Sequence, residues 1–199
     1  GHITVDYGKV LTIGYEGIKK EAEASLATLK TGDGDFMRRY HYLNAIIECC
    51  DAAKAFAERY AVEAERLALE QATADKVICG EQQPESDHFV KMERVRNGDF
   101  NGRHWRMAEK GGWFSYDMRT NSQAVKKLQV ICRGNDRSDA SVQVNGKEVG
   151  IINPANVREP QTFTFDLSDV KAKEGILVVK FSPKSKDVTP RFFEVRLMK

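Results

Sequence analysis

The stretch GRHWRMAEKGGWFSYD, residues 102–117, decides the fold of this chain. Two tryptophans, a phenylalanine and a tyrosine stand around the Gly111-Gly112 pair. Aromatic residues favour strands, whereas glycine pairs mark turns or bulges. We therefore predict two short aromatic strands of a β-sandwich, joined by a tight turn. The stretch contains no nucleophile, base and orienting residue spaced as a catalytic set, so it predicts a class of fold and no reaction.

The rest of the second half repeats this pattern in short segments of alternating apolar and polar residues. Segments about ten residues apart with turn residues between them are typical of an all-β sandwich. Asn145-Gly146 accepts the positive φ angles of a type I′ turn and predicts a hairpin. The predicted strands are residues 76–79, 88–92, 104–107, 113–118, 127–132, 140–144, 148–152, 161–165, 176–181 and 191–197.

The inner faces of the sandwich are predicted from the same alternation. The residues assigned to them are Leu128, Val130, Cys132, Val142, Val144, Val149, Phe163, Phe165, Leu177, Val179, Phe181, Phe193, Val195 and Leu197.

The first third of the chain has the three-and-four spacing of apolar residues that indicates amphipathic helices. We predict one helix over residues 6–29, with Asp6 as its N-cap, and another over residues 35–72. Gly8, Gly14 and Gly17 each cost about 1 kcal/mol relative to alanine inside a helix, which suggests that a neighbouring backbone packs close there or that the first turn frays. The expected fold class is α+β. An antiparallel helix hairpin (1–73) precedes an all-β, jelly-roll-like antiparallel sandwich (74–199).

Charge and cysteine content narrow the classes of function. The net charge is −3 over residues 1–73 and +5 over the remainder, and basic residues alternate with acidic ones, which argues against nucleic acid as a partner. Cys49, Cys50, Cys79 and Cys132 lack zinc-ligand spacing and are interpreted as buried, reduced thiols. No run approaches about 20 apolar residues, so we expect no membrane span, and we expect neither a metal nor a cofactor.

Two helical segments carry a first resemblance. GHITVDYGKVLTIGYEGIKKEAEASL and YLNAIIECCDAAKAFAERYA, within roughly the first 60 residues, resemble the helical part of glycyl radical enzymes of the pyruvate formate-lyase type. That resemblance implies a radical-bearing glycine in an Arg-Val-x-Gly-Tyr loop and a separate catalytic cysteine loop, and this sequence contains neither motif. The adjacent Cys49 and Cys50 match the family's structural helix rather than its catalytic loop.

The second half carries another resemblance. DKVICGEQQPESDH, RHWRMAEKGGWFSYDMR and the NG hairpin resemble the C-terminal β-sandwich of glycoside hydrolases of the β-L-arabinofuranosidase type, common in gut Bacteroides, over about residues 63–199. In that family a helical barrel with a zinc-bound cysteine and a glutamate performs catalysis, and neither Cys79 nor Cys132 lies in a matching segment. The two resemblances meet within residues 60–73, which suggests a chimera, a fusion or a rearranged gene.

Seven residues are candidates for glycan contact, because aromatic rings stack on sugars and polar side chains bind their hydroxyls. They are Asp87, His88, His104, Trp105, Arg106, Trp113 and Tyr116. We favour a structural alternative in which both tryptophans pack between the sheets and Arg106 pairs with Asp87. In that alternative, His88 and His104 hydrogen-bond to backbone.

Glu81, Glu85 and Asp87 are close together in a segment that we expect to be a solvated loop, and we do not assign them as a catalytic pair.

The sequence therefore predicts a non-catalytic accessory domain of a carbohydrate-active enzyme, with no catalytic residue, that gives structural support or weak glycan contact. Two alternatives stay open. The chain is a fragment or accessory subunit of a glycyl radical enzyme, or its exposed helix stripe forms a homodimer or covers a missing catalytic domain. The sandwich resemblance implies a periplasmic or secreted location, and the helical resemblance implies the cytoplasm.

Overall fold

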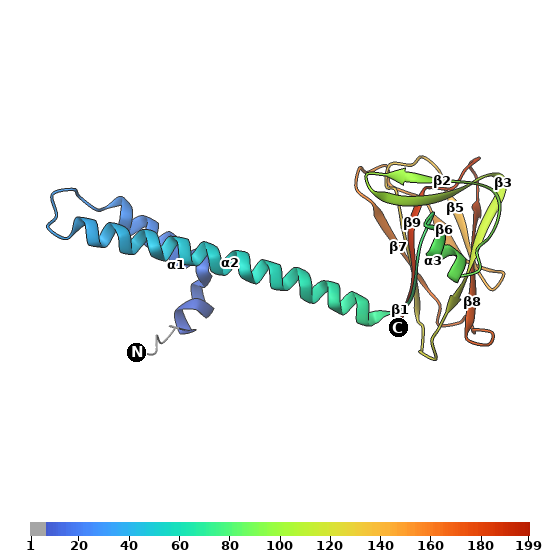
Figure 1. Ribbon diagram of the computed structural model, residues 1–199, viewed down its shortest axis with the longest axis horizontal. Helices are drawn as coiled ribbons and strands as arrows, with labels where there is room; N and C mark the ends of the chain where they lie inside the picture. The colour runs from blue at the N-terminus through green and yellow to red at the C-terminus, as the bar shows by residue number, and fades with distance from the viewer. Residues whose placement is uncertain (1–6) are drawn as a thin grey trace. The chain divides into compact units, whose positions relative to one another are not determined.

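The computed structural model describes residues 7–199 and divides into two compact units between Ala68 and Leu69 (Figure 1). Helices at the N-terminus are followed by an antiparallel β-sandwich of the jelly-roll type, which confirms the predicted α+β class. The predicted N-cap Asp6 lies outside the described residues.

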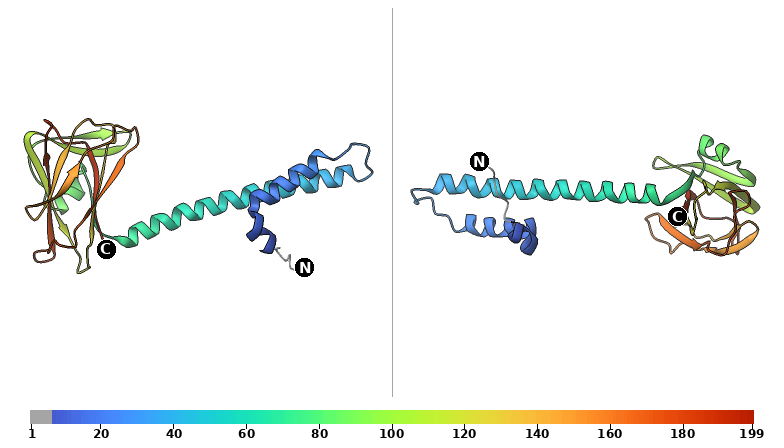
Figure 2. Two further views of the ribbon diagram at one scale, coloured as in Figure 1. Left: turned by 180° about the vertical axis from the view of Figure 1, so that it is seen from behind. Right: turned by 90° about the horizontal axis from the view of Figure 1, so that it is seen from below.

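The helical unit is a hairpin of α1 (Tyr7–Ala27) and α2 (Phe36–Ala72). Figures 1 and 2 show that the later part of α1 lies alongside α2. Exposed ion pairs join the two helices: Lys19 Nζ lies 2.8 Å from Asp51 Oδ1, and Lys54 pairs with Glu16. The predicted helices are thus confirmed to within two residues at the ends that the structure describes.

Gly14 divides α1 into two helical pieces. Its backbone has φ 65° and ψ 178°, a left-handed φ that glycine adopts without steric cost. A Cβ atom at Gly14 would meet nothing within 4 Å, so the predicted close backbone is wrong for this residue. Gly14 therefore marks a kink in the helix and not a packing contact.

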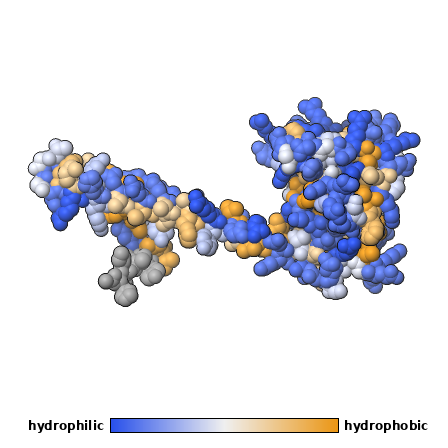
Figure 3. Space-filling model, in the orientation of Figure 1, coloured by the Kyte–Doolittle hydropathy of each residue, from blue (hydrophilic) through white to orange (hydrophobic). Residues whose placement is uncertain are grey.

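The helix pair encloses little of its apolar surface. Among its described residues only Ala22 and Cys50 are buried, while Leu11 is 85% exposed and Tyr60 is 65% exposed. Figure 3 shows apolar residues at the surface of this unit. Amphipathic helices gain most of their stability by burying the apolar face, so this unit presents an incomplete core.

The sandwich unit has two antiparallel layers. One layer follows the order β6-β5-β8-β3-β2, the other follows β1-β9-β4-β7, and β3 joins β9 where Arg106 pairs with Phe192. The strands are β1 (Thr73–Ile78), β2 (Lys91–Phe100), β3 (Arg103–Arg119), β4 (Lys127–Cys132), β5 (Ala140–Val144), β6 (Lys147–Ile152), β7 (Gln161–Asp166), β8 (Ile176–Pro183) and β9 (Phe192–Met198).

Strand β3 is continuous through the Gly111-Gly112 pair, so the predicted tight turn between two aromatic strands is wrong. The register with β2 pairs Trp113 with Glu93 and Ala108 with Val95, which leaves the intervening residues as a bulge. A Cβ atom at Gly112 would lie 2.4 Å from the Arg94 carbonyl oxygen. The glycine pair therefore lets one long strand bend between the layers.

The predicted hairpin at Asn145-Gly146 is confirmed. Asn145 has φ 51° and Gly146 has φ 83°, as a type I′ turn requires, and the turn connects β5 to β6.

The core lies between the two layers and contains Phe114, Phe181 and Phe192 in mutual ring contact, with centroids 4.7–5.7 Å apart. Phe192 belongs to this core and Phe193 does not, contrary to the alternation in the sequence. A register shift between Ile131 and Cys132 places Phe192 opposite Cys132, which reverses the faces at the start of β9. Phe193 instead lies beneath the Arg103 guanidinium.

Three loops converge at one end of the sandwich. Cys132 pairs with both Gln161 and Phe192, and Ala140 pairs with both Ile152 and Pro183. The loops between β4 and β5, β6 and β7, and β8 and β9 therefore leave the strands at the same end. The Asn145-Gly146 turn lies at the opposite end of β5 and β6.

Candidate functional site

A buried polar cluster joins the GEQQPESDH and GWFSY motifs. Residues Gln82–Asp87 form a short helix, α3, where the sequence predicts a loop, and α3 places Glu85 in the interior at 3% exposure. The Glu85 carboxylate accepts hydrogen bonds from Gly80 N at 2.7 Å, from Arg106 Nε at 2.6 Å and Nη2 at 2.5 Å, and from Tyr116 Oη at 2.6 Å. Arg106 thus pairs with Glu85, and the predicted pair with Asp87 is wrong.

The pKa values of three groups in the cluster are shifted away from neutral pH. Burial raises the pKa of Tyr116 well above its ordinary value, and burial likewise raises the pKa of the enclosed Cys79 thiol. Burial opposes the charge of Arg106, but the hydrogen bond to Glu85 outweighs it, so the pKa of Arg106 is raised. The Tyr116 phenol, the Cys79 thiol and the Arg106 guanidinium therefore stay protonated near neutral pH. The cluster ties α3 to β3.

His88 caps α3 in a second polar pair. Its Nδ1 lies 2.6 Å from the Pro84 carbonyl oxygen and its Nε2 lies 3.0 Å from Asp75 Oδ1. Burial lowers the pKa of His88, but hydrogen bonds to Asp75 and Pro84 outweigh burial and the net pKa is raised. The imidazolium form satisfies both contacts because both of its ring nitrogens are donors. The backbone contact predicted for His88 is confirmed.

Three other candidates lie apart from these clusters. Asp87 is exposed, and its Oδ1 accepts a hydrogen bond from Gln83 at 2.8 Å. His104 is exposed, and its ring hydrogen-bonds to no described residue, contrary to the predicted backbone contact. Trp113 is half-buried on the outer face of β3, with Lys180 Nζ 4.2 Å from its ring centroid. Its predicted position between the sheets is wrong, since Phe114 faces the core there.

Trp105 lies in a cleft of about 260 Å³ at the loop end of the sandwich, which also corrects its predicted core position. The half-buried indole lies directly over Gly98 of β2, where an added Cβ would be 2.7 Å from Cζ2. The walls of this Trp105 cleft are formed by Arg96, Met107, Asp136, Arg137, Ser138, Val188, Thr189 and Arg191.

Polar groups surround the indole in the Trp105 cleft. The backbone N–H and Nε of Arg191 donate to Asp136 Oδ2 at 2.8 and 3.0 Å, and the Arg191 guanidinium carbon lies 5.8 Å from the indole centroid. The Ser138 hydroxyl is buried without a hydrogen-bond partner among the described residues. Sequence reasoning missed Asp136, Ser138 and Arg191 because loop residues carry no periodic signal, and only pairing of the strands brings them together.

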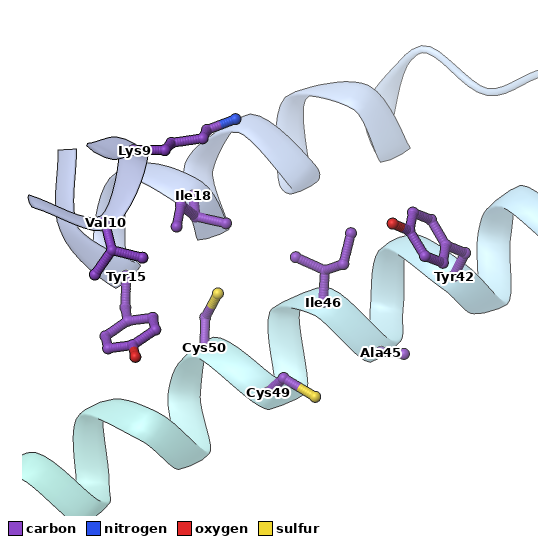
Figure 4. A pocket seen from close by; sticks show the side chains of 9 residues that line it. All are labelled: Lys9, Val10, Tyr15, Ile18, Tyr42, Ala45, Ile46, Cys49 and Cys50. Atoms are coloured by element: carbon purple, nitrogen blue, oxygen red, sulfur yellow. The ribbon is translucent and has the colours of Figure 1, made fainter. Parts of the chain in front are cut away.

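A separate cleft of about 490 Å³ opens between α1 and α2 (Figure 4). It is lined by Lys9, Val10, Tyr15, Ile18, Tyr42, Ala45, Ile46, Cys49 and Cys50. Cys50 is buried, and burial raises the pKa of its thiol. Cys49 is exposed, so the prediction of a buried thiol is wrong for this cysteine.

The two sandwich cysteines are buried as predicted, and burial raises the pKa of Cys132 to about 12. Over residues 7–199, no group of three or more His, Cys, Asp or Glu side chains is placed to hold a metal ion. No helix in that range has the length and apolarity needed to cross a membrane.

A family model described as "Family of unknown function (DUF6805)" matches residues 68–198, which is most of the chain and includes all nine strands. The chain belongs to this family. The polar cluster of Glu85, Arg106 and Tyr116 and the Trp105 cleft both lie within the DUF6805 match. A second family model, "Pyruvate formate lyase-like", matches residues 1–77.

One curated relative resembles the helical part. A (2S)-3-sulfopropanediol dehydratase from Klebsiella oxytoca is 32% identical over 68 residues, which are 34% of this chain and 8% of the relative. The chain therefore spans less than a tenth of the length of that enzyme.

Solved structures similar to the DUF6805 chain include two carbohydrate-binding modules. A family 35 module from Clostridium thermocellum has a TM-score of 0.45 and 12% identity, covering 61% of this chain and 96% of that one. A β-1,3-glucan-binding module, CBM6 from Bacillus halodurans, has a TM-score of 0.44 and 12% identity, covering 62% and 95%. An exo-β-1,3-galactanase from Phanerochaete chrysosporium has a TM-score of 0.46 and 9% identity, covering 63% and 29%.

Proposed function

We propose that residues 74–199 form a non-catalytic accessory module of a carbohydrate-active enzyme, of the type appended to β-L-arabinofuranosidases, and that this module contacts a glycan in the Trp105 cleft. The placement of a half-buried indole among polar side chains carries the proposal. Residues 1–73 form a separate helical domain in this proposal.

The chemistry of the Trp105 cleft suits a sugar. An indole face stacks on the C–H groups of a pyranose or furanose ring, and charged side chains beside it bind the hydroxyls. Asp136 and Arg191 are already held by each other, so their remaining lone pairs and N–H groups are oriented before a ligand arrives. The buried Ser138 hydroxyl without a partner is a further polar group in the wall.

A non-catalytic role agrees with the placement of the ionisable candidates. Glu85 is enclosed by four donor groups, and His88 is held by Asp75 and Pro84, so neither presents a free acid or base to a cleft. Glycoside hydrolysis uses two carboxyl groups on opposite sides of the scissile bond. Within the Trp105 cleft the lining contains a single carboxylate, Asp136, and it is paired with Arg191.

The test is calorimetric titration of the full chain with neutral arabino-, galacto- and gluco-oligosaccharides. Trp105→Ala should abolish binding, while Trp113→Ala, an equally large truncation on the outer face away from the cleft, should leave it unchanged. Near-ultraviolet circular dichroism of both variants checks that the sandwich remains folded. Equal loss in both variants, or no binding by the unaltered chain, contradicts the glycan proposal, and turnover of an arabinofuranoside contradicts the non-catalytic one.

A second candidate function concerns the helical domain and rests on its open apolar cleft and its exposed Phe56 and Tyr60. In this proposal the domain associates with a glycyl radical enzyme of the pyruvate formate-lyase type or with another copy of itself. Ile46→Glu, placed in the cleft, should weaken either association. A monomer mass in light scattering over a wide concentration range excludes self-association, and a pull-down that recovers no such enzyme excludes the other form.

A further inference from the structure

A second cleft at the loop end of the sandwich is lined by three arginines. It encloses about 360 Å³ and is bordered by Arg103 from the start of β3, Arg133 after β4 and Arg158 after β6. It shares no lining residue with the Trp105 cleft, but the loop between β4 and β5 contributes Asn135 to this arginine cleft and Asp136 to the other. The two clefts are therefore neighbours along one loop.

Two of the guanidinium groups are held in place by aromatic rings. The Arg133 guanidinium carbon lies 4.0 Å from the Phe100 ring centroid, and its Nε donates to Asn135 Oδ1 at 2.6 Å. The Arg103 guanidinium carbon lies 5.6 Å from the ring of Phe193, which is itself 5% exposed. Stacking of this kind restricts side-chain rotamers before a ligand binds, which lowers the entropic cost of binding.

The positive charge of the arginine cleft is not neutralised by the protein. None of the lining residues is acidic, and none of the three arginines pairs with a carboxylate among the described residues. Three acids near the cleft are engaged elsewhere: Asp136 with Arg191, Glu194 with Arg196, and Asp99 with the Gly102 N–H. Two others do not line the cleft: Glu159 follows Arg158 in the sequence, and Glu81 lines a neighbouring pocket with Arg103. A concave site with three unpaired guanidinium groups attracts an oxyanion, since Arg presents paired N–H donors that match carboxylate and sulfate oxygens.

We propose that the arginine cleft binds the carboxylate or sulfate group of an acidic saccharide. The inference rests on the proposed function, because the sugar that stacks in the Trp105 cleft would extend along the shared loop into the arginine cleft. The neighbouring Trp105 cleft also contains arginines, but two of them are paired, Arg96 with Glu109 and Arg191 with Asp136. The three arginines of the arginine cleft, which pair with no carboxylate among the described residues, border one pocket, and this suits a single acidic sugar better than a nucleic acid backbone.

The experiment compares three trisaccharides of one length by calorimetry at low salt: a uronate form, a sulfated form and a neutral form. At least one acidic form should bind more than tenfold more tightly than the neutral form, and added NaCl should reduce that difference. Arg158→Gln and Arg133→Gln should each weaken binding of the acidic form about tenfold without changing binding of the neutral form. Lys147→Gln, which removes one charge at the opposite end of the sandwich, is the matched control.

The outcomes separate this inference from the proposed function. If the neutral and acidic forms bind equally and Trp105→Ala abolishes binding of both, the glycan proposal stands and the proposed anion site in the arginine cleft is contradicted. Equal weakening in Lys147→Gln and Arg158→Gln shows attraction by overall charge and also overturns it. Binding of the acidic form that depends on the arginines but not on Trp105 supports the anion site and contradicts the glycan proposal for the Trp105 cleft. If none of the three sugars binds, both fail.

Discussion

The two units of this chain use apolar residues in opposite ways. In the sandwich, twenty residues form one enclosed core, and the buried charges of Glu85 and Arg106 are paired. In the helical unit, large apolar side chains such as Leu11, Phe56 and Val62 are more than 60% exposed. The sandwich therefore encloses its apolar residues, whereas the helical unit leaves much of its apolar face exposed.

The largest loss of unfolding free energy should come from breaking the buried ion pair of Glu85 and Arg106 in the sandwich. Glu85→Ala leaves Arg106 charged and unpaired in the interior, which costs about 3–5 kcal/mol of unfolding free energy. Chemical denaturation followed by near-ultraviolet circular dichroism measures the loss. Glu81→Ala, at an exposed position beside α3, should change it by less than about 0.5 kcal/mol. Equal effects would mean that the cluster does not hold the sandwich together.

A smaller loss of unfolding free energy should follow from adding a methyl group at Gly112, in the bulge of β3. Gly112→Ala places a Cβ within 2.5 Å of the carbonyl oxygens of Glu93 and Arg94, and relief of that clash costs about 1–3 kcal/mol. Gly32→Ala in the turn between the helices meets nothing within 4 Å and serves as the control. A thermal melt of each variant distinguishes them. An unchanged melting temperature in Gly112→Ala would show that the bend in β3 does not require glycine.

The pair of His88 and Asp75 should make the stability of the sandwich sensitive to pH. The raised pKa of His88 contributes stability below the ordinary histidine pKa of about 6.5, and this stability is lost as pH rises through the folded value. The lowered pKa of Asp75 contributes stability that is lost as pH falls through its folded value. Burial opposes the charge of Asp75, but hydrogen bonds from His88 and the Arg119 backbone outweigh burial.

Denaturation at pH 6 and pH 9 tests this pair. The sandwich should lose on the order of 1 kcal/mol between the two values, and His88→Gln should remove most of that change. His104→Gln, at an exposed position, is the control. A pH dependence that persists in His88→Gln would assign it to another group.

The smallest expected difference is in the reactivity of the cysteine thiols in the two units. Cys49 is exposed on α2 and should react with a maleimide in the folded chain, whereas the enclosed Cys79 and Cys132 should react only after denaturation, because burial raises the pKa of both thiols. Mass spectrometry of tryptic peptides counts the labels. Labelling of Cys79 before unfolding would contradict an enclosed sandwich core.

The sequence predicts most of the secondary structure because periodicity is local. The 3.6-residue pattern locates both long helices, and Asn145-Gly146 determines a turn by itself. Alternation locates most of the strands, but the strand predicted over residues 88–92 covers only the first two residues of β2. The α3 helix was predicted as a loop. Two further errors occur where partners distant in sequence decide the outcome. The β2 register turns Gly111-Gly112 into a bulge, and a register shift opposite β4 exchanges the faces of Phe192 and Phe193.

The site was less predictable than the fold for the same reason. The GEQQPESDH and GWFSY motifs stand out in the sequence, yet in the structure Tyr116 donates a hydrogen bond to Glu85 in the interior. Trp105 was a candidate from the sequence, but Asp136 and Arg191 join it from two loops that meet only after the strands pair. Motif residues here maintain the fold, and the clefts are lined largely by residues outside both motifs.

Hydrogen exchange of the full chain, with and without a neutral oligosaccharide, tests the contrast between the units most directly. Amides of β3, β8 and β9 should exchange slowly, amides of α1 and α2 should exchange quickly, and the sugar should protect only the β2–β3 hairpin and the loops after β4 and β8. Helices that exchange as slowly as the core strands, or protection by the sugar elsewhere in the chain, would contradict the account.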